Sequence, residues 1–168
     1  MDDVPAQPAP PRPAPPQPAA PPLPSPRRRG VVGYTAGVFD MFHIGHLHLL
    51  QHARARCDYL VVAVTTDEMA QAVRGRRPVV PLLERMAIVQ SMRCVDHVIP
   101  QLDPDKVAAW QTFRFDVLFA GDNLRGTPAW SSTEAELAGF GVRLDYLPAT
   151  YTRAGHLLER GLADLVAE

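Results

Sequence analysis

Cysteine is scarce in this 168-residue sequence, and no apolar run is long. The two cysteines, Cys57 and Cys94, lie in apolar surroundings and lack metal-ligand spacing, which favours free buried thiols over a disulfide or a zinc site. The longest strongly apolar run, residues 59–64, is far too short to cross a bilayer. We therefore expect a protein of the reducing cytoplasm with no membrane span.

A large excess of charge is also absent, because the formal net charge is −1. Residues 1–29 hold four arginines and two aspartates, so the rest of the chain carries a net charge of −3. This balance argues against a general nucleic-acid binder, which needs a broad basic surface. Any anion that the chain binds must therefore be held by a few locally placed groups.

Residues 1–29 lack both apolar periodicity and the continuous apolar segment of a signal peptide. Twelve of them are proline, mixed with alanine and glutamine. Such a stretch buries no core, and we expect a disordered tail with polyproline II character. Its Pro-x-x-Pro spacing leaves docking to a proline-recognising module open beside a passive tail.

Residues 30–168 alternate between apolar strand-like runs and segments with helical periodicity. The strand-like runs cover residues 31–35, 59–65, 95–99, 116–120 and 142–147. The helix-like segments cover residues 47–56, a short stretch from 67, 82–92, 104–112, 131–137 and a closing stretch with Leu158, Leu162 and Leu165. This alternation predicts one α/β domain, a Rossmann-like doubly wound parallel sheet with helices on both faces. Ligands on such sheets bind at the carboxyl ends of the strands.

Residues 37–46, with the sequence GVFDMFHIGH, join the first predicted strand to the first predicted helix. A glycine-containing loop before a helix N-terminus is suited to phosphate. Gly45 lies inside the helical pattern, where glycine costs about 1 kcal/mol relative to alanine, and close approach of a ligand would explain its presence. His43 and His46 lie about one helical turn apart and can donate to phosphate oxygens. A capping or solvated histidine pair is the structural alternative.

The string His43-Ile44-Gly45-His46 resembles the HxGH signature of the nucleotidyltransferase superfamily. The longer string GVFDMFHIGHLHLL is similar to that of small cytidylyltransferase-like enzymes, closest in pattern to glycerol-3-phosphate cytidylyltransferase. The resemblance implies transfer of CMP, or AMP, from CTP or ATP to a small phosphorylated acceptor such as glycerol 3-phosphate, with release of pyrophosphate. It also implies Mg²⁺ carried mainly by the nucleotide phosphates, no nucleic-acid partner, and a homodimer.

The resemblance also assigns roles to individual residues. His43, His46 and Arg77 are expected to be catalytic, and Asp40 is expected to contact the acceptor. Arginine can grip phosphate in a bidentate manner, although a basic run such as residues 74–77 is often only a solvated loop. The expected contacts to the nucleotide and its phosphates are Gly37, Val38, Phe39, Gly45, Arg74, Arg76, Asp122, Thr150, Thr152 and Arg153.

Three shorter segments resemble the family with changes or with simpler explanations. Gly121-Asp122-Asn123 is similar to the family's GDDW loop, but asparagine replaces the second acid, and a turn after a strand explains it as well. Glu84-Arg85 and residues 93–96 resemble segments that serve the dimer interface and the surroundings of the site. Ordinary salt bridging on a helix is the alternative for both.

Residues 149–156 depart from the family's second signature, an RTxGISTT-like string that holds the β- and γ-phosphates. Alanine stands in place of the arginine, and Ala154-Gly155-His156 in place of the hydroxyl run. A degenerate nucleotide-binding module without turnover therefore stays open beside the enzyme. An aminoacyl-tRNA synthetase fragment, suggested by the HIGH string alone, is disfavoured by the short chain and the lack of a KMSKS-like string.

Overall fold

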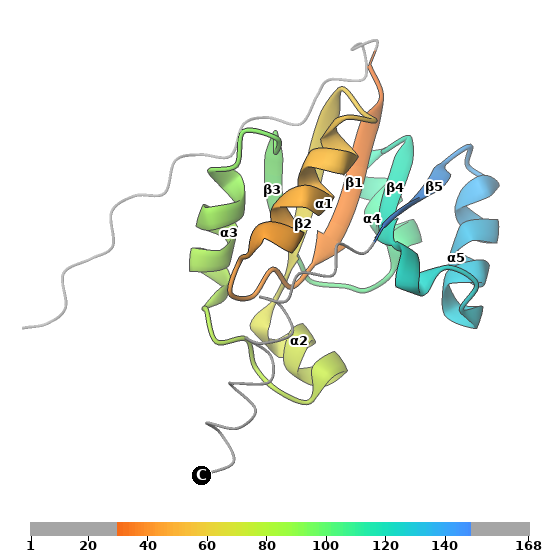
Figure 1. Ribbon diagram of the computed structural model, residues 1–168. Coiled ribbons are helices and arrows are strands. Elements are labelled where there is room, and N and C mark those ends of the chain that lie inside the picture. The colour runs from red at the N-terminus through yellow and green to blue at the C-terminus, as the bar shows by residue number, and fades with distance from the viewer. Residues whose placement is uncertain (1–29, 149–168) are drawn as a thin grey trace, which may run out of the picture.

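The computed structural model describes residues 30–148, which form a five-stranded parallel sheet with helices on both faces (Figure 1). The strands are β1 (Val32–Gly37), β2 (Tyr59–Thr65), β3 (His97–Gln101), β4 (Val117–Gly121) and β5 (Arg143–Leu147), in the spatial order β3-β2-β1-β4-β5. The chain builds one half of the sheet outward from β1 and then crosses to the other side of β1. The predicted Rossmann-like, doubly wound α/β fold is confirmed.

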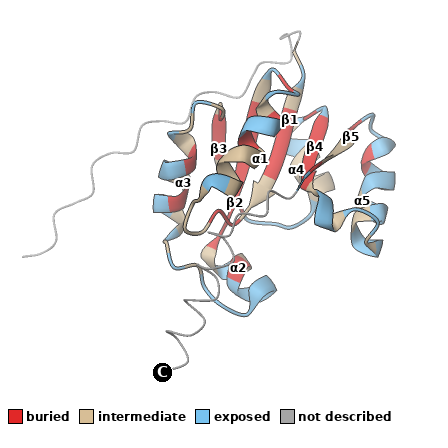
Figure 2. Cartoon of the chain, viewed as in Figure 1, coloured by how far each residue is buried: buried red, intermediate tan, exposed pale blue. Residues whose placement is uncertain are grey.

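Helices cover each face of the sheet, and one short helix lies beyond the carboxyl ends of the strands (Figure 1). They are α1 (Ile44–Arg54), α2 (Asp67–Arg74), α3 (Leu82–Gln90), α4 (Lys106–Phe113) and α5 (Pro128–Ala138), with a 3-10 turn η1 (Asp122–Leu124) after β4. One apolar cluster holds α1 and α3 to the sheet through Leu50 and Val89. A second cluster holds α4 and α5 to the opposite face through Trp110 and Leu137. Figure 2 shows that the buried residues are concentrated on the inner strands between these layers.

Three aspartates fasten the amino ends of the strands. Asp58, Asp96 and Asp116 each precede a strand, and each carboxylate accepts a backbone N–H near the start of the adjacent strand, at 2.7, 2.7 and 2.8 Å. Charged acceptors make the stronger class of hydrogen bond. The backbone at the amino ends of the strands is therefore hydrogen-bonded to the protein's own side chains. The carboxyl ends of the strands are left for a ligand.

Most element boundaries differ from the sequence predictions by one to three residues; helix α5, for example, begins at Pro128 rather than at 131. Helix α1 begins at Ile44 rather than at 47, because the side chain of His43 caps the helix. Strand β3 begins at His97, two residues later than predicted, because the chain still turns there after α3. The tail at 1–29 and the closing stretch at 158–165 lie outside the described residues. Within the described part of the chain, no helix is long and apolar enough to cross a membrane.

Candidate active site

The candidate site lies at the carboxyl ends of β1 and β4, where the strand order reverses. In an open parallel sheet the loops after two such strands diverge to opposite faces and leave a crevice between them. Gly37 ends β1, and a Cβ added there would lie 3.1 Å from the ring of Phe39. Gly121 ends β4, and a Cβ there would lie 2.5 Å from the side-chain oxygen of Asn123. Both loops can therefore turn sharply as they leave the sheet.

The loop between β1 and α1 carries unusual backbone conformations. Phe39 has φ 53° and Met41 has φ 43°, in the left-handed region that non-glycine residues seldom adopt. The ring of Phe39 is buried in the core beneath α1, which holds this conformation in place. Strain of this kind is concentrated at functional sites, where the surrounding structure fixes it.

His43 and His46 form a reciprocal cap at the start of α1. The Nδ1 atom of His43 accepts the N–H of Gly45 at 3.1 Å, and the N–H of His43 donates to Nδ1 of His46 at 3.4 Å. The two rings are stacked with their centroids 3.9 Å apart. The capping alternative is thus realised, and it holds both imidazoles at the helix N-terminus.

These hydrogen bonds also determine which ring nitrogen carries the proton. A backbone N–H can only donate, so each Nδ1 must present its lone pair, and in a neutral imidazole the hydrogen then resides on Nε2. No acceptor among residues 30–148 takes a hydrogen bond from either Nε2. Two N–H donors are therefore available to a ligand beside the N-terminus of α1, where anions are favoured.

His46 is neutral at physiological pH. Burial lowers its pKa to about 4, and the nearby His43 and Arg74 lower it further against an opposing effect of Asp40. Loss of hydration penalises the protonated ring, which explains the direction of the shift. The ring therefore acts as a hydrogen-bond donor rather than as a cation.

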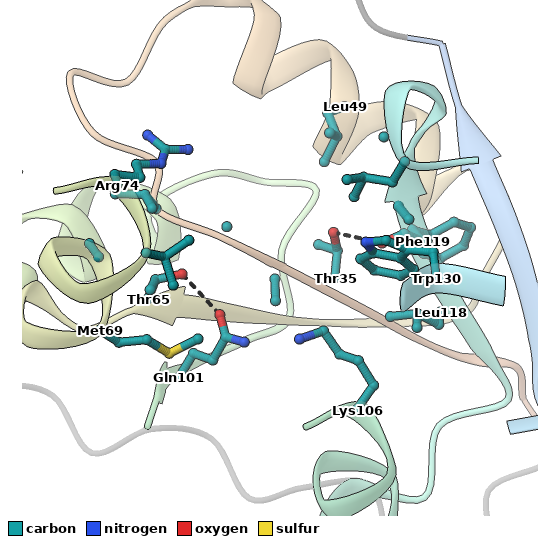
Figure 3. Close-up of a pocket in the computed structure, with 18 residues that line it drawn as sticks. Thr35, Leu49, Thr65, Met69, Arg74, Gln101, Lys106, Leu118, Phe119 and Trp130 are labelled. Atoms are coloured by element: carbon teal, nitrogen blue, oxygen red, sulfur yellow. Dashed lines mark hydrogen bonds between the residues drawn. The ribbon is translucent and has the colours of Figure 1, made fainter. Parts of the chain in front are cut away.

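Two cavities adjoin at this point. The first, which we call the histidine cavity, has a volume of about 160 Å³ and is lined by His43, His46, Asp40 and the loop that joins them. The second, the strand-end cavity, has a volume of about 230 Å³ and extends over the ends of the strands toward α4 and α5 (Figure 3). Both are lined by Gly37, Val38 and Arg74, so one ligand can enter both.

The three arginines of the basic segment have different surroundings. Arg74 lines both cavities, and Arg76 lines the histidine cavity. Arg77 lines neither cavity, and its guanidinium group lies 3.5 Å from Glu68 and donates to Gln71 at 3.0 Å. The structure thus places Arg74 and Arg76 with the histidines and places Arg77 in an exposed ion pair beside them.

Hydrogen bonds of the side chains of Asp40 and Arg85 join the β1–α1 loop to the segment between α2 and α3. We call these contacts the clasp. The Asp40 carboxylate accepts the N–H groups of Met41, Val79 and Val80 at 2.9–3.0 Å. In return, Arg85 donates to the carbonyl oxygens of Val80 at 2.8 Å and of Val38 at 2.5 Å. Asp40 thus faces the site while its oxygens organise the backbone around it.

Arg85 is the largest fully buried side chain among the described residues, with 1% of its surface exposed. Its guanidinium group also donates to the carbonyl oxygen of Thr65 at 2.8 Å and pairs with Asp67. A buried charge requires such complete pairing. Sequence reasoning missed this role, although Arg85 lies at helical spacing between Leu82 and Val89 on the apolar side of α3, which was the available signal.

The remaining predicted residues are divided between the rim of the site and the undescribed end of the chain. Asp122 follows β4, is exposed, and pairs with Arg125 at 2.9 Å; its neighbours Gly121 and Leu124 line the strand-end cavity. Thr150, Thr152 and Arg153 lie outside the described residues. Sequence reasoning also missed several side chains of the strand-end cavity: Thr65, Gln101, Lys106 and Trp130.

Comparison with protein families and curated proteins gives consistent results. A family model described as cytidylyltransferase-like matches residues 34–145. The bifunctional protein HldE of Acidiphilium cryptum is 37% identical over 131 residues, which cover 76% of this chain and 27% of that protein. An FAD synthase of Thermococcus sibiricus is 34% identical over 103 residues, or 54% of this chain and 70% of that protein. The chain thus spans about a quarter of HldE and most of the archaeal synthase.

A third curated relative and a solved structure are also similar to this chain. The ethanolamine-phosphate cytidylyltransferase of Arabidopsis thaliana is 48% identical over 73 residues, which cover 44% of this chain and 17% of that protein. The crystal structure of a lipopolysaccharide core biosynthesis protein from Thermoplasma volcanium is similar with a TM-score of 0.62 and 22% identity. That match covers 72% of this chain and 97% of the other, and it supports the fold.

Proposed function

This chain belongs to the cytidylyltransferase-like family of nucleotidyltransferases, and on that premise we propose that it transfers CMP or AMP from CTP or ATP to a small phosphorylated acceptor. Pyrophosphate is the second product. Glycerol 3-phosphate is the first acceptor to test, on the resemblance of the signature string. The relatives include an ethanolamine-phosphate cytidylyltransferase and an FAD synthase, so other phosphorylated acceptors belong in the same test.

The single observation that supports this proposal best is the stacked pair of imidazoles with both Nδ1 atoms occupied. A phosphate oxygen of the acceptor attacks the α-phosphorus, and the bond from that phosphorus to the bridging oxygen of the β-phosphate breaks. Negative charge grows on the non-bridging oxygens during this step. Two fixed Nε2–H donors beside a helix N-terminus stabilise that charge without reorganisation.

The site needs no base to deprotonate the acceptor, because an acceptor phosphate is already ionised at neutral pH. The protein chiefly positions the two substrates and stabilises charge. We propose that Arg74 and Arg76 hold phosphate oxygens in the histidine cavity and that the backbone at Gly37, Val38, Phe39 and Gly45 lies against the nucleotide. Arg77, Asp122, Thr150, Thr152 and Arg153 are proposed as further contacts to the triphosphate or the base.

Magnesium is proposed to enter with the triphosphate as part of the substrate. Within residues 30–148, no group of three or more metal-ligating side chains comes together, and Asp40 already accepts three backbone N–H groups. Mg²⁺ is commonly held largely by substrate phosphates. Asp40 serves the acceptor, in this proposal, through the loop conformation that it maintains.

We further propose a homodimer located in the cytoplasm. The exposed apolar side chains of Val79, Leu83 and Ile88 lie around α3 and offer a surface for a second copy. Cys57 and Cys94 are free thiols, which suits a reducing compartment where nucleoside triphosphates are also abundant. Sedimentation of the purified chain tests the dimer directly.

The proposal is tested by incubating the protein with CTP or ATP, Mg²⁺ and a panel of phosphorylated acceptors, and by following pyrophosphate. Glycerol 3-phosphate, phosphoethanolamine, phosphocholine, FMN and a heptose phosphate span the relevant chemistry. Release that requires both substrates supports the proposal. Absence of release with every pair, in protein whose folding is verified by circular dichroism, overturns it.

The alternative is a nucleotide-binding module without turnover, and the altered string at residues 149–156 is the observation that favours it. Titration calorimetry with CTP and ATP separates the two. Binding without pyrophosphate release supports the module. Binding together with turnover eliminates it.

A further inference from the structure

The outer face of α1 carries two histidines that belong to neither cavity. His48 and His52 are four residues apart in this helix, so their side chains lie on the same face, one turn apart. Neither residue lines the histidine cavity or the strand-end cavity. Figure 2 shows α1 in front of the sheet with exposed residues on its outer side; His52 is exposed and His48 is half-buried. This pair is therefore separate from the pair formed by His43 and His46.

The two rings already lie side by side. Their centroids are 6.5 Å apart, and the ring planes differ by 25°. Among residues 30–148, neither ring takes part in a hydrogen bond or an ion pair, so its nitrogens are open to a ligand. Two imidazoles that bind one ion through nitrogens at about 2.0–2.1 Å have ring centres roughly 5 Å apart. A small rotation of the two side chains therefore brings both rings onto a single ion.

The backbone beneath the pair is fixed by the core. Leu50 and Ala53 lie on the opposite side of α1, have no exposed surface, and belong to the apolar cluster under the helix. Only side-chain rotations then have to be ordered when an ion binds. Once one imidazole holds the ion, the second binds it as an intramolecular ligand at high effective concentration. The pair should therefore bind an ion more tightly than a single histidine does.

The charges near the pair do not oppose a cation. Arg56 donates to the carbonyl oxygen of His52 at 3.1 Å, and its charge is offset by Asp145 at 3.4 Å. Arg54 is likewise paired with Asp96 at 3.4 Å. His52 lies in the last turn of α1, where the carbonyl dipoles of a helix favour positive charge.

We propose that His48 and His52 bind one divalent transition-metal ion of the class that prefers imidazole, which comprises Ni²⁺, Cu²⁺ and Zn²⁺. No third histidine, cysteine, aspartate or glutamate joins the pair among the residues that the structure describes, so water fills the other coordination positions. Mg²⁺ prefers oxygen ligands and does not bind here. The inference is independent of the proposed transferase reaction, whose Mg²⁺ enters with the triphosphate.

A bound ion would stabilise the folded protein. It links two consecutive turns of α1, and the two imidazoles are held at this spacing only while the helix is formed. A ligand that binds the folded chain more tightly than the unfolded chain raises the free energy of unfolding. The same helix begins at the cap formed by His43, so the ion fastens the element that carries the signature histidines.

Calorimetry of the full chain with Ni²⁺, in the absence of nucleotide and Mg²⁺, tests the site. We expect one ion per chain, and we expect His48→Gln to weaken binding at least about tenfold, equivalent to about 1.4 kcal/mol. The double variant His52→Gln with Ala55→His is the matched control. It keeps all six histidines of the sequence but places the second imidazole two turns from His48, out of reach of the same ion. Equal affinities in the native protein and the double variant overturn the inference.

The signature histidines are the competing site for the ion. Their Nδ1 atoms accept backbone N–H groups, and their rings are stacked with centroids 3.9 Å apart, so the ring nitrogens do not converge on one ion. We therefore expect His43→Asn to leave the affinity for Ni²⁺ unchanged. Loss of binding in His43→Asn, with binding retained in His48→Gln, would place the ion at the signature and overturn the inference.

Urea denaturation gives a second measurement that depends on the helix. We expect Ni²⁺ to raise the urea midpoint of the native protein, by up to about a hundredfold in the folding constant when free Ni²⁺ exceeds the dissociation constant a hundredfold. The double variant should show no such shift, and EDTA should reverse the shift in the native protein. Mg²⁺ at the same concentration is the control for ionic strength. An unchanged midpoint at saturating Ni²⁺, or an equal shift in the double variant, overturns the inference.

Discussion

The two histidines of the signature present the same ring atom to a ligand, because backbone N–H groups occupy Nδ1 on both. Neither ring can exchange its tautomer without giving up a cap on α1. The pair is therefore a rigid double donor. This matters for the proposed catalysis because donors that are already in position need no reorganisation as charge develops.

Replacement of His43 tests that role at the level of a single side chain. His43→Asn retains an N-cap residue of high propensity, so α1 is preserved. We expect kcat for pyrophosphate release to fall by about a hundredfold to a thousandfold, the usual loss when one such donor is removed. His52→Ala, at an exposed position of the same helix, is the control. Near-normal turnover in His43→Asn, with an unchanged unfolding midpoint, would refute the donor role.

The lowered pKa of His46 predicts a loss of stability in mild acid. The unfolded chain takes up the proton near pH 6.5, whereas the folded protein resists it until about pH 4. Unfolded protein therefore binds more protons across this window, and the free energy of unfolding falls as pH decreases through it. The contribution of His46 is complete above pH 6.5 and is lost progressively toward pH 4.

At pH 5 this linkage amounts to about 2 kcal/mol. We expect urea denaturation of the native protein to show that much additional loss between pH 7 and pH 5 relative to His46→Asn, which has no titrating ring at this position. The asparagine also retains an acceptor for the N–H of His43. Parallel declines in the two proteins would show that His46 titrates normally in the folded state.

At the scale of elements, the site depends on a clasp between two loops rather than on a single loop. Asp40 binds the backbone before α3, and Arg85 from α3 binds the backbone beyond β1. Each side chain also joins further segments, so β1, β2, α2 and α3 meet at the guanidinium group. The strained conformations at Phe39 and Met41 are held inside this clasp.

Loss of the buried guanidinium group should loosen all four elements. We expect Arg85→Met to reduce the free energy of unfolding by about 3 to 5 kcal/mol, because Asp67 and three carbonyl groups lose their partner. Arg85→Lys restores the charge without the forked geometry, so the loss should be smaller and kcat should still fall. Arg143→Lys is the exposed control. An undiminished kcat in a folded Arg85→Lys protein would limit the role of Arg85 to stability.

The strands and helices were predictable because the pattern of apolar residues along the chain follows burial directly. Strand β2, for example, is a continuous apolar run and is buried on both faces. The position of the two histidines beside a cavity was predictable because they belong to one contiguous string between a strand and a helix. The role of Arg85 was not, because it arises from contacts between segments distant in sequence. Helical spacing indicated that Arg85 faces the core, but no local pattern indicated which carbonyl groups it would meet.

At the scale of the whole molecule, the described residues form two apolar clusters, one on each face of the sheet. Both apolar clusters draw their buried members from residues 34–147, and helices cover each face of the sheet. Three aspartates bind the backbone at the amino ends of the strands, and both cavities lie at the carboxyl ends. The three aspartate contacts and the proposed chemistry thus lie at opposite ends of the same strands.

This arrangement predicts that residues 1–29 are dispensable for folding and turnover. A chain that begins at Gly30 keeps β1 and the carboxylate contacts at its start, so we expect the same urea midpoint and the same kcat as the full chain. A chain that begins at Ala36 loses most of the central strand and the buried ring of Tyr34, and it should not fold. Circular dichroism and pyrophosphate release measure both. Destabilisation of the Gly30 chain would place residues 1–29 within the folded domain.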